Sequence, residues 1–155
     1  MYKRLLLASD GSRESLVSLR EGALIAQSFK AETHLLIVDR ESPSALMAST
    51  LSGQQIPAVG RDLLDLGLHR LRQLGIQATG ELVRGDPTQA IIDRVKRFKA
   101  DLVVLGHRRQ SFFERWWSGP AGGYIADGVP CSILIARDTI SDEEFNLRLI
   151  KGSFQ

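Results

Sequence analysis

The residues best suited to bind a ligand lie between two apolar runs in the last third of the chain. The first run, residues 102–105, ends at Gly106, and the second, residues 131–136, follows Pro130. Short apolar runs of this kind are typical of strands buried on both faces. The segment between them contains Gly119 and a group of cationic side chains, which are His107, Arg108, Arg109 and Arg115. Glycines that frame a loop between two buried strands predict a ligand-binding loop.

The sequence offers little support for catalysis. The three histidines, His34, His69 and His107, fall on a predicted strand, helix and loop, with no i, i+4 pair and no cysteine at metal-ligand spacing. The residues around Gly119 lack the serine of a G-x-S-x-G nucleophile elbow. Cys131 has no cationic neighbour in sequence, so we expect a small buried hydrophobic residue rather than a nucleophile. We therefore expect a protein that is not an enzyme and has no metal site of its own.

The composition is that of one ordinary globular domain. The chain has 155 residues, of which 43% are hydrophobic and 25% charged, enough to bury a substantial core. Its formal net charge of +2 comes from intermixed basic and acidic residues, so nucleic acid is not an expected partner. Cys131 is the single cysteine, no secretory leader is recognisable, and no apolar run reaches the roughly 20 residues that span a bilayer. These features predict a soluble cytoplasmic protein with no membrane partner.

Apolar periodicity in the first third of the chain predicts two strands joined by a helix. Residues 2–8 form a strand that stops at the polar turn 9–12, and one helix with apolar residues at helical spacing follows as far as Ala26. Residues 34–38 form the second strand. Residues 41–57 have no convincing period and are rich in Ser, Gly, Gln and Ala, so we expect a mobile loop there.

The alternation continues through the middle of the chain. A second helix, lined by leucines, ends at Gly75, and a third strand follows over residues 76–83. Asp86 is placed to cap a third helix with Pro87 at its first position. The apolar run 102–105 is then the fourth strand.

Repeated strand and helix units predict an α/β fold, a doubly wound parallel sheet with helices on both faces. Ligands bind such sheets beyond the carboxyl ends of the strands, where the strand order reverses. Asp10, Val38, Asp39 and the Gly106 loop all lie at strand ends of this kind. They are the positions that geometry selects for a site.

Five segments of the chain resemble universal stress proteins of the UspA type. In chain order they are LLLASDGSRES, HLLIVD, GDPTQAII, ADLVVLGHR and PCSILIAR. The resemblance covers residues 2–137 in the right order and spacing, so it predicts a domain over residues 1–137 and an extension over residues 138–155. It implies a five-stranded sheet in the order 3-2-1-4-5 and a homodimer paired through the fifth strand.

The family resemblance also implies a nucleotide site. In nucleotide-binding members, an Asp after the first strand holds the ribose and a backbone group at the end of the second strand meets the adenine. Asp10 and the backbone of Val38 would take these roles for ATP or another adenine nucleotide, with Mg²⁺ accompanying ATP as the only metal. The family's phosphate loop follows the pattern Gly-x2-Gly-x9-Gly-Ser/Thr. Gly106 and Gly119 match its first and third glycines.

Two positions of that loop depart from the family pattern. Arg109 replaces the second glycine, which lets the backbone approach a phosphate, and Pro120 replaces the hydroxyl residue and lacks an N–H donor. Since a hydrogen bond to a charged group contributes about 1.5–3 kcal/mol, losing two weakens binding on the order of a hundredfold or more. The alternative is that Arg108 and Arg109 grip the phosphates in place of the lost donors.

Each candidate residue also has a structural explanation. Asp10 is a favoured helix cap, Gly106 and Gly119 are of the type that marks turns, and Val38 suits a strand core. The basic run 107–109 suits a solvated loop. The same segment contains four aromatic residues, Phe112, Phe113, Trp116 and Trp117. We expect some of this group to pack on the loop over residues 42–56 or on a partner, with an aromatic lid as the alternative.

The segment after Arg137 predicts a short terminal helix. Ser141 and Glu144 have the spacing of a capping box, Ile140 and Phe145 that of a hydrophobic staple, and Gly152 is placed to end the helix. A frayed end and a strand are the alternatives.

Three functional classes remain open from the sequence. The first is a stress-associated module that signals through adenine nucleotide binding, with or without slow ATP hydrolysis. The second is a family member with weak or lost nucleotide binding that acts through dimer and partner contacts. The third is an enzyme. The enzyme has the least support, because no further catalytic constellation is present.

Overall fold

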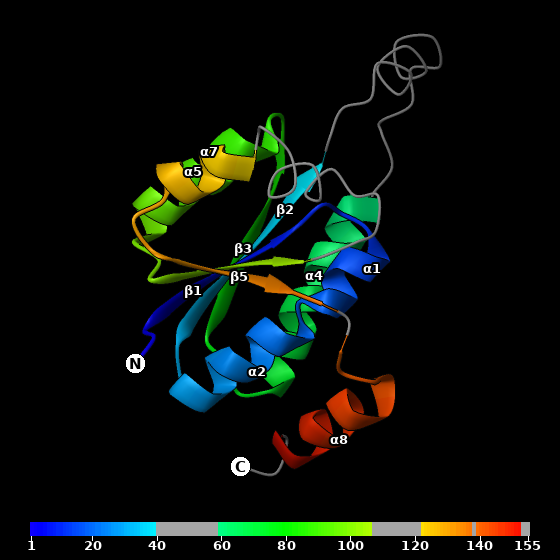
Figure 1. Cartoon of the computed structure of the whole chain (residues 1–155). Helices are drawn as coiled ribbons and strands as arrows, with labels where there is room; N and C mark the ends of the chain where they lie inside the picture. The colour runs from blue at the N-terminus through cyan, green and yellow to red at the C-terminus, as the bar shows by residue number, and fades with distance from the viewer. Residues whose placement is uncertain (40–58, 107–121, 138, 153–155) are drawn as a thin grey trace, which may run out of the picture.

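A five-stranded parallel sheet forms the centre of the molecule (Figure 1). The computed structural model describes residues 1–39, 59–106, 122–137 and 139–152. The strands are β1 (Arg4–Ser9), β2 (Glu32–Asp39), β3 (Ala78–Arg84), β4 (Leu102–Gly106) and β5 (Ser132–Ala136), in the order β3-β2-β1-β4-β5. The doubly wound α/β sheet and its strand order are confirmed.

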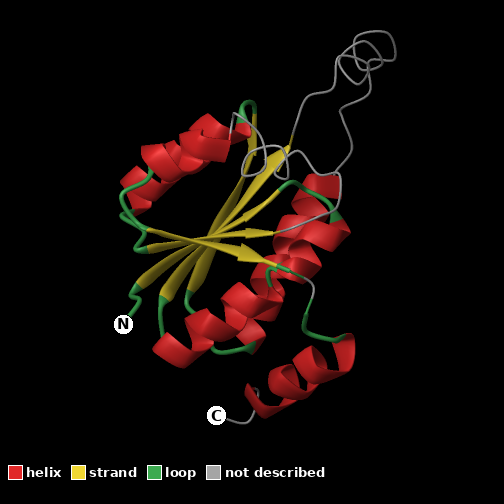
Figure 2. Cartoon of the chain, in the orientation of Figure 1, coloured by secondary structure: helices red, strands yellow, loops and turns green. Residues whose placement is uncertain are grey.

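Helices cover both faces of the sheet (Figure 2). One layer contains α1 (Arg13–Ser18), α2 (Arg20–Phe29) and α4 (Val59–Gln73), and the other contains α5 (Pro87–Phe98) and α7 (Gly122–Gly128). Side chains alternate between the two faces along each strand, so Leu5 and Leu7 belong to the core under α1, α2 and α4, whereas Leu6 and Ala8 belong to the core under α5. No helix among the described segments combines the length and the apolarity that a bilayer crossing needs.

The first helix differs from the prediction, because two helices replace one. The side-chain hydroxyl of Ser18 donates to the carbonyl of Ser15 at 2.7 Å, and this carbonyl lies four residues before Leu19, where it would accept that residue's N–H in a continuous helix. The N–H of Leu19 instead turns toward Val17. The interruption at Leu19 separates α1 from α2.

Other helix ends follow the expected chemistry. Asp86 caps α5 by accepting a hydrogen bond from the backbone N–H of Gln89 at 2.8 Å, with Pro87 in the first helical position. After α4, the chain turns at Gly75, which has a φ of 74°, a value that glycine adopts without steric cost. The 41–57 loop lies outside the described residues.

The chain beyond Arg137 forms α8 (Asp142–Gly152), which packs near α4. Ser141 accepts a hydrogen bond from the backbone N–H of Glu144 at 3.2 Å, as in a capping box. Phe145 is buried and, with Ile140, joins the core under α2 and α4. The helix is therefore anchored by its first turn.

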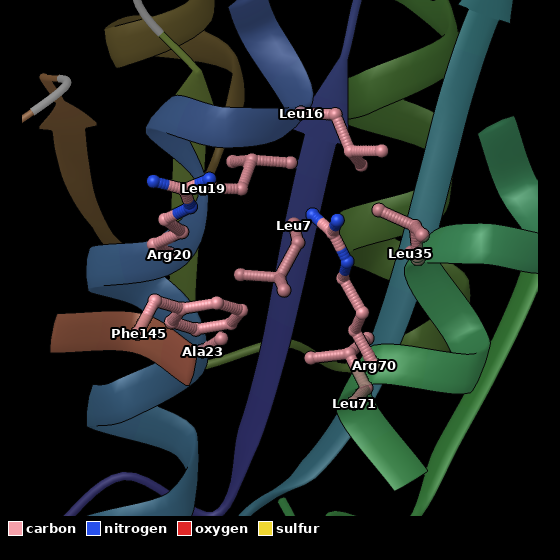
Figure 3. A pocket seen from close by; sticks show the side chains of 10 residues that line it. Leu7, Leu16, Leu19, Arg20, Ala23, Leu35, Arg70, Leu71 and Phe145 are labelled. Atoms are coloured by element: carbon pink, nitrogen blue, oxygen red, sulfur yellow. The ribbon is translucent and has the colours of Figure 1, made fainter. Parts of the chain in front are cut away.

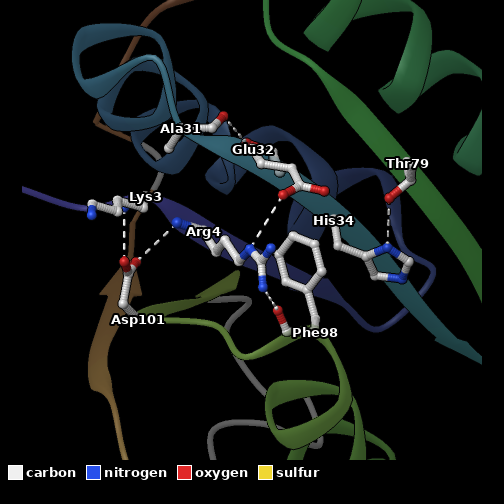
Figure 4. Close-up of polar contacts among 9 residues, drawn as sticks. Lys3, Arg4, Ala31, Glu32, His34, Thr79, Phe98 and Asp101 are labelled. Atoms are coloured by element: carbon white, nitrogen blue, oxygen red, sulfur yellow. Dashed lines mark hydrogen bonds and ion pairs between the residues drawn. The ribbon is translucent and has the colours of Figure 1, made fainter.

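Charged side chains close the amino ends of the strands (Figure 4). The carboxylate of Asp101, just before β4, accepts from the backbone N–H groups of Lys3 at 2.8 Å and Arg4 at 3.2 Å. The guanidinium of Arg4 pairs with Glu32 at 3.2 Å and donates to the carbonyl of Phe98 at 3.3 Å. These contacts join β1, β2, β4 and the end of α5.

Candidate functional site

The candidate site lies at the carboxyl ends of β1, β2 and β4. The register pairs Ser9 of β1 with Ile37 of β2, and Ala8 of β1 with Leu105 of β4. Asp10, Val38 and Gly106 each follow one of these paired positions, so they meet at one edge of the sheet. The chain crosses from β3 on one side to β4 on the other, so the strand order reverses beside β1, where open α/β sheets bind ligands.

Asp10 is held by the residues that start α1. Its Oδ1 accepts two hydrogen bonds from Ser12, from the backbone N–H at 3.0 Å and from the hydroxyl at 2.6 Å. Its own N–H donates to the Ser15 hydroxyl at 3.4 Å. Both Ser12 bonds end on Oδ1, and among the described residues no hydrogen bond reaches the second carboxylate oxygen of this half-buried residue.

The cap of α1 is Ser12, and the structural role considered for Asp10 as the cap is wrong. The Ser12 hydroxyl accepts from the backbone N–H of Ser15 at 3.1 Å, which satisfies one of the free donors of the first turn. Gly11, between the two residues, adopts a φ of 79°, and Asp10 lies two residues before the cap. Asp10 orients the cap instead of providing it.

Gly106 is fixed by close packing against α1. A side chain on Gly106 would place its Cβ 2.6 Å from the Ser15 hydroxyl and 2.8 Å from the Ser18 hydroxyl, with the Ser15 carbonyl oxygen closer still. Real Cβ atoms essentially never come so near another heavy atom. The end of β4 therefore requires glycine whether or not a phosphate binds there.

Val38 can offer a ligand its backbone only. Its side chain is 1% exposed and belongs to the core under α5. Along β2, the N–H of Glu32 donates to Lys3 on the β1 side and that of Thr33 to Gln77 on the β3 side. Because successive residues alternate in this way, the backbone groups of Val38 face the β1 side, next to the end of β1.

The other candidate residues are not placed. Arg108, Arg109 and Gly119 lie outside the described residues, as do the aromatic residues of the 107–121 segment. The structure thus brings together three of the six candidates, Asp10, Val38 and Gly106.

Sequence reasoning missed a set of buried serines around the site. Ser9 and Ser15 are both 0% exposed and Ser18 is 1% exposed. Ser9 accepts from the backbone N–H of Gly11 at 3.2 Å, and Ser15 and Ser18 pack against Gly106. The signal was the recurrence of serine every three residues from Ser9 to Ser18, which places hydroxyls along the start of α1.

The described residues offer little beyond hydroxyls and backbone groups for chemistry. No group of three or more His, Cys, Asp or Glu side chains among them could hold a metal ion. Cys131 is half-buried, and burial raises the pKa of its thiol, with the nearby charge of Asp101 acting in the same direction. A raised pKa keeps the thiol protonated at neutral pH, which is unfavourable for a nucleophile.

The geometry matches a known group of proteins. The model of the universal stress protein family matches residues 1–137. The chain belongs to this family. A universal stress protein A homologue from Haemophilus ducreyi is 31% identical over 76% of the chain and 85% of its own length. Universal stress protein MJ0531 from Methanocaldococcus jannaschii is 24% identical over 88% of the chain and 83% of its own length.

Solved universal stress proteins share the fold. One, in complex with cAMP, superposes with a TM-score of 0.64 at 21% identity, over 89% of this chain and 98% of its own. Another, from Archaeoglobus fulgidus in complex with dAMP, gives a TM-score of 0.60 at 15% identity, over 88% of this chain and 98% of its own. The family match ends at Arg137, so α8 lies beyond it.

Proposed function

We propose that this universal stress protein is a homodimeric, stress-associated binding module whose crevice holds the adenosine part of an adenine nucleotide and binds the phosphates weakly. The observation that carries the proposal is the Asp10 carboxylate, which Ser12 orients at the point where the strand order reverses. One of its oxygens is engaged and the other can accept from a ribose hydroxyl. The relatives solved with cAMP and dAMP show that adenine nucleotides suit this fold.

The phosphate half of the proposed site is argued from the sequence. Gly106 has a packing reason to be glycine, so its match to the family loop is weaker support for phosphate binding than it first suggested. Arg109 and Pro120 replace the positions that would supply close backbone approach and a terminal donor. Fewer phosphate contacts should leave adenosine, AMP and ATP with similar affinities.

Calorimetric titration of adenosine, AMP and ATP tests the proposal. We expect the three dissociation constants to agree within about threefold, because a lost phosphate hydrogen bond removes the roughly tenfold gain that one such bond gives. Asp10→Ala should weaken all three ligands equally. Arg109→Gly combined with Pro120→Ser should strengthen ATP binding and leave adenosine unchanged.

The opposite pattern would identify the alternative mechanism. If Arg108 and Arg109 replace the lost donors, ATP binds much more tightly than adenosine, its affinity falls as salt is raised, and Arg109→Gly weakens it. Absence of binding by all three ligands would leave dimer and partner contacts as the function of the protein.

The dimer is proposed from the edge of the sheet. β5 pairs with β4 along one side, and three of its apolar residues, Ile133, Leu134 and Ile135, are only half-buried. The prediction that β4 is buried throughout is confirmed. The prediction that β5 is buried on both faces is wrong for the single chain. An apolar edge strand is a template for pairing with a second chain.

A proline substitution tests the edge without damaging the sheet. The N–H of Ser132 donates to Asp101 on the β4 side, so by alternation the N–H of Ile135 points to the open edge. Ile135→Pro therefore removes a donor that β4 does not use. We expect wild type and Ile135→Val to sediment as dimers at micromolar concentration, and Ile135→Pro as a folded monomer. A monomeric wild type would refute the assembly.

A further inference from the structure

The helix α8, at the periphery of the molecule, carries exposed apolar side chains (Figure 1). Leu147 is 53% exposed and Ile150 is 58% exposed. Apart from Met1, they are the most exposed large apolar residues in the described part of the chain. Together with Glu143 they follow the spacing i, i+4, i+7 of one helix face. Leu147 and Ile150 therefore form a short apolar stripe in contact with solvent, which we call the α8 stripe.

The opposite face of α8 is fixed to the domain. Phe145 is 4% exposed and points from α8 toward α2, beside Arg20 and Ala23 (Figure 3). The guanidinium carbon of Arg20 lies 5.3 Å from the centre of the Phe145 ring. The same guanidinium donates to the carbonyl of Ile140 at 2.9 Å and contacts the carboxylate of Asp142. These contacts hold the first turn of α8 in one orientation, so the α8 stripe faces away from the domain.

The two ends of α8 carry charges of opposite sign. Residues 142–144 are all acidic and lie in its first turn, and Lys151 lies in its last turn. Glu144 and Lys151 are exposed, and their i, i+7 spacing places both along the same side of the α8 stripe. Within the described part of the chain neither of them forms an ion pair. The charges beside the stripe therefore complement those of an identical helix that runs in the opposite direction.

We propose that the α8 stripe docks on the α8 stripe of a second copy of this chain, with the two helices antiparallel. A two-fold axis near Leu147 brings the two leucines together, with Ile150 of each copy packing beside them. Because a two-fold axis pairs equal sides of the two helices, Glu144 of one copy then faces Lys151 of the other, twice. Parallel helices would instead bring like charges together, which is unfavourable.

The contact is weak and is separate from the edge of the sheet. The 11 residues of α8 extend over about 16 Å, so a pair of these helices buries less than the roughly 1,200–2,000 Å² of a stable complex. The contact joins two dimers if β5 pairs the chains, and two single chains if it does not. The inference therefore does not depend on the dimer proposed above. Since the family match ends at Arg137, the contact belongs to the extension and not to the common domain.

Sedimentation equilibrium measures this contact as a rise of the mean mass with concentration. We expect the mass of the wild type to rise toward twice its low-concentration value between about 10 μM and 1 mM, the range of a weak interface. Leu147→Ser should weaken the association about tenfold or more, because two leucines lose their burial at each contact. This substitution leaves the docked face of α8 intact. Leu66→Ser is the matched control, since it removes a 36% exposed leucine from α4.

Charge reversal tests the antiparallel arrangement. Glu144→Lys and Lys151→Glu should each associate less than the wild type, because like charges then face each other across the axis. An equimolar mixture of the two variants should recover the association, because each cation again faces a carboxylate of the other copy. In parallel helices neither single variant would associate less than the wild type.

Three results would overturn the proposal. One is a mass that stays constant up to about 1 mM, the weak limit of such a contact. Another is an equal effect of Leu147→Ser and Leu66→Ser, which indicates unspecific association of apolar surface. The third is binding of the wild type to anionic phospholipid vesicles without self-association, which would assign the α8 stripe to a lipid surface. Ile135→Pro separates this contact from the β5 edge, since its mass should rise from that of one subunit toward that of two.

Discussion

The two ends of the sheet are closed by different kinds of side chain. At the amino ends, long charged residues join neighbouring strands, as in the contacts of Arg4 with Glu32 and of Asp101 with two backbone N–H groups. At the carboxyl ends, Gly106 and buried serines such as Ser9 and Ser15 pack closely. One end is closed by paired charges, and the other by small residues in close contact.

This difference indicates which end of the sheet can bind a ligand. Arg4, Glu32 and Asp101 at the amino end direct their charged groups to one another's strands instead of to a ligand. At the carboxyl end the hydroxyls of Ser9 and Ser15 are buried, and the partly exposed turn from Asp10 to Ser12 presents the Asp10 carboxylate. The end with small residues is also the end that the topology favours for binding.

We expect the largest effect from adding a side chain among the small residues at the carboxyl ends of the strands. Gly106→Ala places a methyl group 2.6 Å from the Ser15 hydroxyl and against the Ser15 backbone. Because backbone cannot move aside as a flexible side chain does, we expect a loss of about 2–3 kcal/mol in the free energy of unfolding. Urea denaturation measures it.

Gly75→Ala is the control for this substitution. A Cβ on Gly75 meets nothing within 4 Å, but the residue has a φ of 74°, so only backbone strain of about 1 kcal/mol is expected. If the two variants lose the same stability, the close contact at Gly106 is not what the carboxyl end depends on.

Local signals in the sequence predicted the elements and the parallel sheet, and the family resemblance supplied the strand order. The leucines of β1 and β2, the Asp86 cap and the turn at Gly75 each predict their own element. The interruption at Leu19 was not predictable from local periodicity, since it accompanies a hydrogen bond from the Ser18 hydroxyl to the carbonyl that Leu19 would otherwise use. The ends of the strands also differed from the predicted ones by one or two residues. Neighbouring strands decide where pairing stops, and these neighbours are distant in sequence.

The site was predicted in part. Asp10 and Val38 were located by strand ends and by the family resemblance. The packing role of Gly106 was not, because its neighbours Ser15 and Ser18 are distant in sequence and meet it only in the folded chain. Sequence patterns show which residue is glycine, and only tertiary contacts show why.

Two aspartates at opposite ends of the sheet provide a smaller test. In Asp101 each carboxylate oxygen accepts from a backbone N–H, at 2.8 Å and 3.2 Å, so Asp101→Asn loses one bond and the charge. We expect a loss of about 1 kcal/mol at these exposed contacts. Asp10→Asn retains the acceptor for Ser12 and should cost less than about 0.5 kcal/mol.

The same pair separates stability from binding. Adenosine affinity should fall in Asp10→Asn and stay unchanged in Asp101→Asn. If Asp10→Asn is the more destabilising of the two, the carboxylate is a structural group and the contrast between the two ends fails.

A buried histidine also lies at the amino end. His34 of β2 is 8% exposed and lies under α5, with its Nδ1 2.9 Å from the Thr79 hydroxyl and its ring centre 5.5 Å from that of Phe98. Burial lowers its pKa, and the charge of Arg94 lowers it further, while Glu81, which is paired with Arg94, opposes both. The net direction is downward from 6.5.

The smallest expected effect is a dependence of stability on pH that arises from His34 at this end. Because the pKa of His34 is lower in the folded chain than its unfolded value of 6.5, the unfolded chain takes up a proton first as the pH falls. The contribution of neutral His34 is therefore fully present above about pH 6.5 and is lost progressively below it, until the folded-state pKa is passed. Urea denaturation at intervals between about pH 7.5 and 5 measures the slope. His34→Gln should reduce that slope, whereas His69→Gln, at an exposed position of α4, should leave it as in the wild type. A slope that survives in His34→Gln would place the titrating group elsewhere in the molecule and remove this distinction between the two ends.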